Sequence, residues 1–274
     1  MTTTSFSWSA VAPAWDRHRA HIEQTKAPAT TALLEALRLT PGERLLELGA
    51  GTGELAVQLA AAVAPGQVIA SDVAPAMVAL LESTLRHTAN ATAEQLDACA
   101  LALPDASVDV VVFRMGLMLM DEPSAALREI RRVLRPGGRL GLVVWAGPEH
   151  NPWMVAVGMS AMMHGLVSGG PPTGPGGPFS LSDADGLRGL VAAAGFRDVD
   201  VAPVETPSHF VDEAEHFDTV SSLAGPLGVA LATASADALA AVRATTAEIV
   251  RQYKTEKGLV LPGRALVCTA IANH

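Results

Sequence analysis

The sequence is poor in several residue types, and each shortage excludes a class of protein. Cys99 and Cys268 are the only cysteines in 274 residues, too few for a disulfide framework. We therefore expect free thiols and a cytoplasmic location. No apolar run approaches the roughly 18 residues of a membrane span, so none is predicted. The N-terminus "MTTTSFSWSAVAPAW" lacks the basic and apolar regions of a secretion signal.

Charge is also scarce. Charged residues make up 17% of the chain and hydrophobic residues 49%, and the net charge is −9. Nucleic-acid binding depends on Lys and Arg that neutralise phosphates, so this balance argues against a nucleic-acid partner. The local cluster of Arg128, Arg131, Arg132 and Arg135 is better interpreted as the exposed face of one helix.

Strands and helices are predicted to alternate through the first half of the chain. Strand patterns occupy residues 44–49, 66–72, 94–99, 107–116 and 139–145, and helix patterns occupy about 28–39, 53–64, 74–88 and 123–135. This rhythm predicts right-handed βαβ units, and therefore a doubly wound α/β sheet.

The pattern changes beyond Trp145. We expect a helix at 151–168, a Gly/Pro loop at 169–178, a helix at about 182–194, a strand at 197–205, two or three helices within 211–254 and a last strand at 264–272. The predicted organisation is an N-terminal arm or short helices (1–27), an α/β core (28–150) and a third part (151–274). In that third part, a helical insert (about 151–180 and 211–254) separates the last strands and forms a lid over the carboxyl edge of the sheet.

The stretch "LLELGAGTGELA" brings Gly49, Gly51 and Gly53 together where the first strand becomes a helix. In an open α/β sheet, ligands bind at the carboxyl ends of the strands. Glycines there let backbone N–H groups approach a ligand closely. The alternative is a tight turn without a ligand.

Acidic residues follow the next strands in the order that a nucleoside site needs. Asp72 ends the second strand and can accept the hydroxyls of a ribose, although it can also cap the helix that follows. Asp97 and Ala98 end the third strand and can frame an adenine edge. Glu47 is a further candidate cofactor-binding residue. It lies within an apolar strand, where a buried carboxylate requires a cationic or hydrogen-bonding partner.

A nicotinamide dinucleotide fits less well. Its GxGxxG fingerprint needs a glycine where Glu54 stands, and a carboxylate repels a pyrophosphate. The sequence therefore favours a nucleoside without phosphates over an NAD oxidoreductase.

The segments "ELGAGTGEL", "ASDVAPAMV", "LDACALALPDASVDVVVFRMGL" and "ALREIRRVLRPGGRLGLVVW" together resemble the class I S-adenosylmethionine-dependent methyltransferases. The pattern is most similar to the branch of quinone-biosynthesis C-methyltransferases and bacterial small-molecule methyltransferases. The resemblance covers about residues 30–146, with weaker agreement at 180–205. It implies a Rossmann-like, mostly parallel seven-stranded sheet of order 3-2-1-4-5-7-6 with an antiparallel last strand, and S-adenosylmethionine as the cofactor.

The resemblance also implies roles for individual residues. The three glycines would pass under the methionine and ribose parts of the cofactor, and Asp72 would bind the ribose hydroxyls. Val73 and Met77 would flank the adenine, Asp97 and Ala98 would meet its edge, and the backbone near Arg114 would hold the methionine amino group.

Methyl transfer to oxygen benefits from a general base, for which histidine is suited. His150, directly after the fifth strand, is the first candidate, followed by His164 and His216; a surface or capping role is the alternative for each. Trp15, Met118, Asn151 and Trp153 are candidate substrate-binding residues. The methionines around Met118 suit either a core or an adaptable apolar wall.

The predicted function is methyl transfer to oxygen or carbon of a hydrophobic small molecule, in bacterial secondary metabolism or quinone-like biosynthesis. A pericyclase or lyase that binds S-adenosylmethionine without methylating is the alternative. A noncatalytic binding protein is disfavoured by the intact glycines and Asp72. No metal site is predicted. The apolar insert and the arm also suit a homodimer interface.

Overall fold

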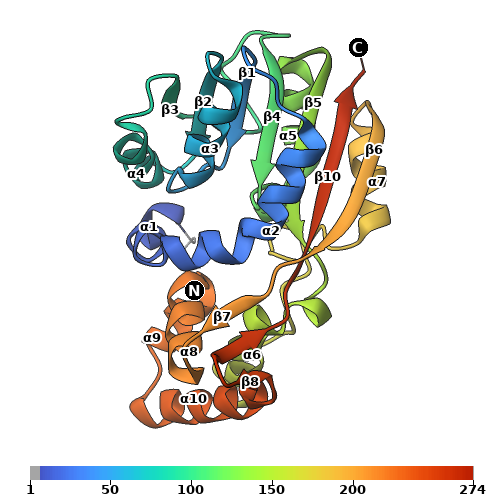
Figure 1. The fold of residues 1–274 in the computed structure, drawn as a ribbon. Helices are drawn as coiled ribbons and strands as arrows, with labels where there is room; N and C mark the ends of the chain where they lie inside the picture. Colours follow the sequence, from blue (N-terminus) through green and yellow to red (C-terminus); the bar gives the residue numbers. More distant parts are fainter. Residues whose placement is uncertain (1–6, 274) are drawn as a thin grey trace.

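A computed structural model describes residues 7–273, and its central feature is a seven-stranded sheet (Figure 1). The strands are β1 (Arg44–Leu48), β2 (Gln67–Asp72), β3 (Ala91–Gln95), β4 (Val108–Arg114), β5 (Leu134–Trp145), β6 (Phe196–Glu205) and β10 (Arg264–Ala272), in the order β3-β2-β1-β4-β5-β10-β6. The first five pair in parallel, and β10 runs antiparallel to β5 and β6. Because β6 and β10 are the sixth and seventh strands of this sheet along the chain, the predicted order and its antiparallel last strand are confirmed.

Helices cover both faces of the sheet, and its central strands β1, β2, β4 and β5 are largely buried apolar runs, as expected of a parallel sheet covered on both faces. The helices are α2 (Arg19–Leu37), α3 (Glu54–Val63), α4 (Pro75–Leu85), α5 (Pro123–Val133) and α7 (Ala184–Ala193). In Figure 1, α2 crosses in front of the sheet and α5 lies behind it. A Cβ on Gly141 of β5 would stand 2.8 Å from the side chains of Leu33 and Leu37, so glycine lets α2 approach the sheet closely.

The helix predicted at about residues 28–39 begins earlier in the structure. Two helices precede that point: α1 (Trp8–Arg17) and α2, which starts at Arg19 and contains Pro28. A proline inside a helix removes one hydrogen bond and costs about 3 kcal/mol. Here the buried positions of α2, Ile22, Thr25, Ala29, Thr30, Leu33 and Leu37, continue on both sides of the proline, and their packing outweighs that cost.

A second unit lies below the large sheet in Figure 1 and has its own hydrophobic core. It contains α6 (Pro152–Met163), α8 (Glu213–Leu223), α9 (Pro226–Ala232), α10 (Ala236–Val250) and a small sheet of β7 (Ser208–Phe210), β9 (Gly258–Leu261) and β8 (Lys254–Thr255). The three helices within 211–254 match the predicted pattern. The small sheet was not predicted, since strands of two to four residues carry too little alternation to be recognised.

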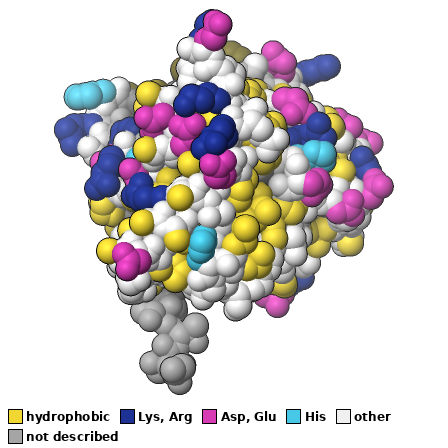
Figure 2. Space-filling model, turned by 90° about the horizontal axis from the view of Figure 1, so that it is seen from below, with side chains coloured by type: hydrophobic (Ala, Val, Ile, Leu, Met, Phe, Trp, Pro, Cys, Tyr) yellow, Lys and Arg dark blue, Asp and Glu magenta, His cyan; other side chains and the backbone are white. Residues whose placement is uncertain are grey.

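Seen from below, the second unit exposes apolar side chains between charged ones (Figure 2). The exposed large hydrophobic residues of this unit include Met159, Met162, Met163, Val211 and Val229. The apolar residues of the predicted insert are therefore partly at the surface of this unit. A homodimer through this unit stays a prediction.

Asn151 joins the two units and does not serve as a substrate contact. It follows β5 and is fully buried. Its Nδ2 donates to the carbonyls of Ala146 (3.0 Å), Gly147 (3.2 Å) and Arg264 (3.0 Å), and its Oδ1 accepts from the Arg264 N–H at 3.0 Å. The side chain thus satisfies backbone groups where the chain leaves β5 and where it enters β10.

Replacing Asn151 with alanine is expected to lower the free energy of unfolding by about 2–4 kcal/mol, because buried backbone groups lose their partners. Urea denaturation followed by circular dichroism measures this change. Gln58→Ala, an amide truncation on the exposed face of α3, is the matched control and should alter stability by no more than about 0.5 kcal/mol. Equal stabilities of the two variants would contradict the proposed structural role.

Glu47 is an ionisable residue inside the sheet. It lies in β1, is 1% exposed, and its Oε2 has no hydrogen-bond partner among residues 7–273. Burial raises its pKa to about 8, although the nearby Arg114 favours the charged form. The expected hydrogen-bonding partner is therefore not found for Oε2. At neutral pH the carboxyl is mostly protonated, which lowers the cost of burying it.

The raised pKa of Glu47 predicts a pH-dependent stability. The folded protein retains a proton that the unfolded chain releases near its ordinary pKa of 4.5. This contribution is therefore complete below that pH and is lost as pH rises through about 8. Compared with Glu47→Gln, which stays neutral, the wild type should lose on the order of 3 kcal/mol of stability between pH 5 and 8. Urea titrations of both proteins at several pH values measure the difference, and a constant difference would contradict a buried neutral carboxyl.

Candidate cofactor site

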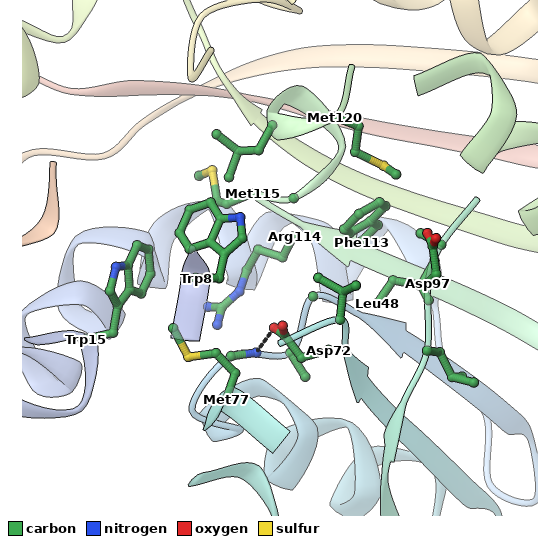
Figure 3. Close-up of a pocket in the computed structure, with 18 of the residues that line it drawn as sticks. Trp8, Trp15, Leu48, Asp72, Met77, Asp97, Phe113, Arg114, Met115 and Met120 are labelled. Carbon is green, nitrogen blue, oxygen red and sulfur yellow. Dashed lines mark hydrogen bonds between the residues drawn. The ribbon is translucent and has the colours of Figure 1, made fainter. Parts of the chain in front are cut away.

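A cavity of about 450 Å³ opens at the carboxyl ends of β1, β2 and β4, beneath α1 and α2 (Figure 3). Its volume is within the range of small-molecule sites. The wall comes from the turn after β1, the end of β2, the segment after β3, the end of β4 with the loop that follows, and the two N-terminal helices. No residue beyond Glu122 lines it. Within the described chain, α1 and α2 therefore cover the cavity, and the predicted lid segments 151–180 and 211–254 do not.

The glycine turn contributes bare backbone to the cavity at Gly49 and Gly51, which have φ values of +61° and +57°. These left-handed conformations favour glycine. Nothing lies within 4 Å of the position of a Cβ on Gly51, so the backbone is open there. Gly53 has a different role: it does not line the cavity, and a Cβ there would stand 2.7 Å from Leu81 Cδ1. It allows α3 to pack against α4.

Asp72 links the glycine turn to the end of β2. Its Oδ2 accepts from the Gly51 N–H at 3.1 Å, and its Oδ1 accepts from the Ala74 N–H at 3.0 Å. Burial raises its pKa above the ordinary value, against the effect of these backbone bonds. The carboxylate lines the cavity (Figure 3) and is held in one orientation, with lone pairs left for a ligand hydroxyl.

The other residues expected at a nucleoside also meet in this wall. Val73, Met77, Asp97 and Ala98 all line the cavity. Asp97 and Ala98 lie beyond the end of β3, which runs from Ala91 to Gln95 instead of the predicted 94–99. Asp97 Oδ1 accepts from the Cys99 N–H at 2.8 Å, so its loop is ordered at the cavity.

Helix α1 is held over the cavity by a small hydrophobic cluster. Ala12 of α1 packs with Ala74 and Met77 at the start of α4, and the cluster includes Trp8 and Trp15. The two indole rings meet edge to face with centroids 6.0 Å apart, and both line the cavity. The predicted residue Trp15 is therefore part of this wall.

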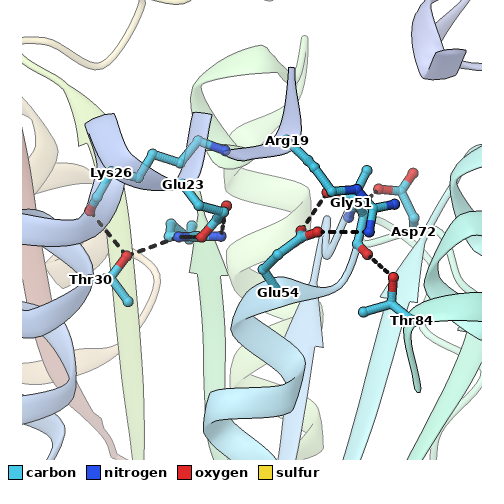
Figure 4. A network of polar contacts seen from close by, with 10 residues as sticks. Arg19, Glu23, Lys26, Thr30, Gly51, Glu54, Asp72 and Thr84 are labelled. Atoms are coloured by element: carbon cyan, nitrogen blue, oxygen red, sulfur yellow. Dashed lines mark hydrogen bonds and ion pairs between the residues drawn. The ribbon is translucent and has the colours of Figure 1, made fainter. Parts of the chain in front are cut away.

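A buried ionic network lies where α2 faces β4 (Figure 4). Arg114 donates from Nη1 and Nη2 to the two carboxylate oxygens of Glu23 at 2.8 and 2.7 Å, and from Nη1 to Thr30 Oγ1 at 2.9 Å. Burial opposes ionisation of Glu23, but Arg114 and Lys26 keep its pKa below the ordinary value. This bidentate pair fixes α2 on the end of β4.

Sequence reasoning missed Glu23 and Lys26, which line the cavity together with Arg114. Their spacing of three residues, with Thr30 four residues further, places all three on one face of α2. Glu23 and Lys26 lie beside the apolar residues Ile22, Ala29 and Leu33 of α2. Charged residues next to the buried face of a helix are the signal that could have identified them.

The structure does not bring the predicted histidines to this cavity. His150 lies after β5, with Nε2 3.4 Å from Glu149 Oε1. His164 follows α6, and its Nε2 is 2.8 Å from Thr245 Oγ1. His216 is fully buried in α8, its Nε2 is 2.8 Å from the Trp153 carbonyl, and burial lowers its pKa. All three histidines lie away from the cavity for the same reason: the chain after β5 leads into the second unit.

Two more predicted substrate contacts belong to the core. Met118 is 2% exposed, and its sulfur accepts from the Trp145 N–H at 3.3 Å. Trp153 packs edge to face on Trp145, with centroids 5.5 Å apart, between the two hydrophobic clusters. The cavity's apolar wall includes Met115, Leu119 and Met120. Methionine side chains therefore line the cavity as expected, but these are Met115 and Met120 and not Met118.

Within residues 7–273, no three His, Cys, Asp or Glu side chains are grouped as metal ligands would be. In the same part of the chain, no helix has both the length and the apolar character needed to cross a membrane.

The sequence matches the family profile described as "Methyltransferase domain" over residues 46–142. It is 33% identical over 121 residues to the ubiquinone/menaquinone biosynthesis C-methyltransferase UbiE of Shewanella frigidimarina (strain NCIMB 400). That alignment covers 43% of this chain and 48% of the relative. The alignment thus spans about half the length of this curated relative. The profile match over residues 46–142 contains the glycine turn, Asp72, Asp97 and Arg114.

Two solved structures share the fold. The [4+2]-cyclase SpnF superposes with a TM-score of 0.58 at 22% identity, covering 99% of this chain and 98% of the cyclase. Phosphoethanolamine N-methyltransferase 2 of Haemonchus contortus, solved with S-adenosylmethionine, superposes with a TM-score of 0.55 at 17% identity, covering 90% of this chain and 52% of that one. Together with the family profile, these similarities confirm the resemblance seen in the sequence: residues 46–142 match a methyltransferase domain, and the chain has the fold of solved S-adenosylmethionine-dependent methyltransferases.

Proposed function

We propose that the protein transfers a methyl group from S-adenosylmethionine to a carbon or oxygen atom of a hydrophobic small molecule. The observation that carries this proposal is the composition of one cavity wall. Nucleoside-recognising groups, Asp72 and Asp97 with the open backbone at Gly51, share it with the apolar side chains of Trp8, Trp15, Met115, Leu119 and Met120. A polar end for a nucleoside and an apolar end for an acceptor are what such a transfer requires.

The residues of this chain fit the cofactor. Asp72 is held by the Gly51 and Ala74 N–H groups and would accept the ribose hydroxyls. Val73 and Met77 would flank the adenine, and Asp97 and Ala98 would meet its edge. The backbone at Arg114 would hold the methionine amino group, at the end of β4. Bound S-adenosylmethionine supplies an electrophilic methyl group on a sulfonium.

The absence of histidine from the cavity wall among the described residues is compatible with this chemistry. Positioning of two reactants alone can supply roughly 7–11 kcal/mol in favourable cases. Carbon acceptors of the hydroquinone type are themselves electron-rich. The similarity to quinone C-methyltransferases supports carbon as the acceptor atom and a quinone-like ring as the acceptor class.

A second candidate is supported by the extent of one similarity. The cyclase SpnF is covered over 98% of its length, whereas the alignment to the C-methyltransferase covers 48% of that relative. A putative methyltransferase of Haloferax volcanii is also covered over its whole length, so the extent of the similarity is compatible with both functions. The alternative function is therefore a cyclisation in the same cavity, in which the cofactor is bound and not consumed.

Calorimetry with S-adenosylhomocysteine tests the cofactor site. Asp72→Ala should weaken binding by about 1–3 kcal/mol, or roughly 5- to 150-fold, through lost charge-assisted hydrogen bonds. Asp200→Ala, an exposed carboxylate on β6, is the matched control and should bind as the wild type does. The unfolding temperature without ligand must be measured for both, since Asp72 also orders the glycine turn. Unchanged affinity in a folded Asp72→Ala protein would refute the ribose assignment.

Mass spectrometry of acceptor mixtures distinguishes the two candidate functions. With S-adenosylmethionine and alkylated naphthoquinols or phenols as probes, the methyltransferase is expected to give products about 14 Da heavier and one S-adenosylhomocysteine for each. A substrate that is rearranged at constant mass, without S-adenosylhomocysteine, would support the cyclase and overturn methyl transfer.

A further inference from the structure

Histidines gather where the cover of the cavity meets the second unit. In Figure 1, β7 and α8 lie directly below α1 and α2. Helix α2 packs against β7, and α1 packs against α8. Four histidines come from these elements or from the link between α1 and α2: His18, His21, His209 and His216. The described residues that line the cavity include no histidine, so these four can act on a ligand only through the helices that cover it.

Phe210 of β7 lies between two imidazole rings. The ring of His21, from α2, packs on it at a tilt with centroids 4.6 Å apart, and the ring of His216, from α8, meets it edge to face at 5.0 Å. His21 Nε2 also lies 3.2 Å from Ser208 Oγ, which is 3.2 Å from Thr25 Oγ1, one turn further along α2. One small set of buried or partly buried side chains therefore joins α2, β7 and α8.

The surroundings of His216 suit only a neutral ring. Its Nε2 lies 2.8 Å from the Trp153 carbonyl, which can only accept, so the ring carries its proton on Nε2. Nδ1 is buried and has no partner among residues 7–273. A second proton on Nδ1 would create a buried charge and a buried donor without an acceptor, and both cost free energy. Burial accordingly lowers the pKa of His216, against the effect of the Trp153 carbonyl.

The charged groups around His21 do not compensate a proton on its ring either. Burial lowers its pKa, Glu215 of α8 opposes this shift, and His18 and His209 add to it. Glu215 is exposed, and its carboxylate also accepts from the Val211 N–H, so solvent screens its attraction. His18, in the link before α2, and His209, of β7, become like charges in acid. His21 is therefore held as a neutral ring.

We propose that Phe210 and the two imidazoles packed on it, His21 and His216, form an acid-sensitive latch through which the second unit holds α2 over the cavity. Ile22, the residue after His21, lines the cavity, so one turn of α2 meets both the latch and the ligand site. At neutral pH the rings are uncharged and the latch is closed. In acid, protonated rings are more stable in water than in this apolar junction, so α2 separates from β7.

The pH window follows from the direction of the two shifts. Both histidines have pKa values below the ordinary 6.5 in the closed latch, and a ring released into water returns to that value. Their contribution to the closed latch is therefore complete above pH 6.5 and is lost as pH falls from there to the lower pKa. For one histidine that stays neutral in the closed latch, the ratio of open to closed protein rises about 10-fold between pH 7.5 and 5.5.

Native-state hydrogen exchange measures this opening. Protection factors of amides in α2 and β7, corrected for the intrinsic effect of pH, should fall about 10-fold in the wild type between pH 7.5 and 5.5. His21→Gln cannot ionise and should lose most of this fall. His21→Phe also lacks the charge but keeps a ring against Phe210, and it replaces the glutamine variant if that protein does not fold. His87→Gln, at an exposed histidine after α4, is the matched control and should behave as the wild type does.

Ligand exchange provides a second readout, and this part of the inference rests on the proposed function. Because α1 and α2 cover the cavity, a bound nucleoside leaves it when they open. Trp8 and Trp15 line the cavity, so their fluorescence can follow the dissociation of S-adenosylhomocysteine. Dissociation from the wild type should be as much as about 10-fold faster at pH 5.5 than at pH 7.5, and this acceleration should be smaller in His21→Gln.

The outcomes separate the alternatives. Equal wild-type protection at both pH values, or the same fall in the folded His21 variants as in the wild type, would overturn the latch. A fall that disappears in His18→Gln but not in the His21 variants would assign the pH dependence to the link between α1 and α2, and would overturn it as well. Dissociation rates that do not follow the protection factors would refute control of the cavity by the latch. Failure of S-adenosylhomocysteine to bind at either pH would overturn the proposed function, and hydrogen exchange would still decide the latch.

Discussion

The candidate site depends on the parallel pairing of β1 with β2. In this register Leu48 lies opposite Ser71, so the turn after β1 and the carboxylate after β2 emerge side by side. The Ala50 N–H donates to the Ser71 carbonyl at 2.8 Å, and the Gly51 N–H donates to Asp72 at 3.1 Å. A shift of one residue would turn Asp72 to the other face of the sheet. The register of the sheet therefore fixes the position of Asp72 relative to the glycine turn.

A second constraint is electrostatic. The chain carries few charges, yet several of them are buried where α2 meets the sheet. Arg114 and Glu23 compensate each other, Glu47 is neutralised by a raised pKa, and Lys26 is left as the cation of the wall. Buried charges stabilise a fold poorly, so this concentration around one cavity points to binding more than to stability.

The two units of the protein divide these roles. The candidate cofactor cavity is lined, among the described residues, by those up to Glu122, with α1 and α2 as its cover. The second unit has its own core of α6, α8, α10 and the small sheet, and Asn151 and Trp153 connect it to β5 and β10. Its histidines serve packing and hydrogen bonding within it or at its surface.

The sequence by itself determined the α/β class, the glycine turn and the acidic groups expected at a nucleoside. These depend on local periodicity and on residues at strand ends, and parallel strands bring their carboxyl ends to one edge whatever the details of packing. Asp72, Asp97 and Ala98 could be chosen for that reason, whereas the order of the large sheet and the roles of Val73 and Met77 were implied by the family resemblance of the sequence. Only the tertiary structure decided which helices cover the cavity, that Pro28 lies inside α2, and that Asn151, Met118 and the three histidines lie outside the wall. It also placed Lys26 and Glu23 in the wall. Such contacts join residues far apart in sequence, and packing between elements, which no local pattern encodes, selects them.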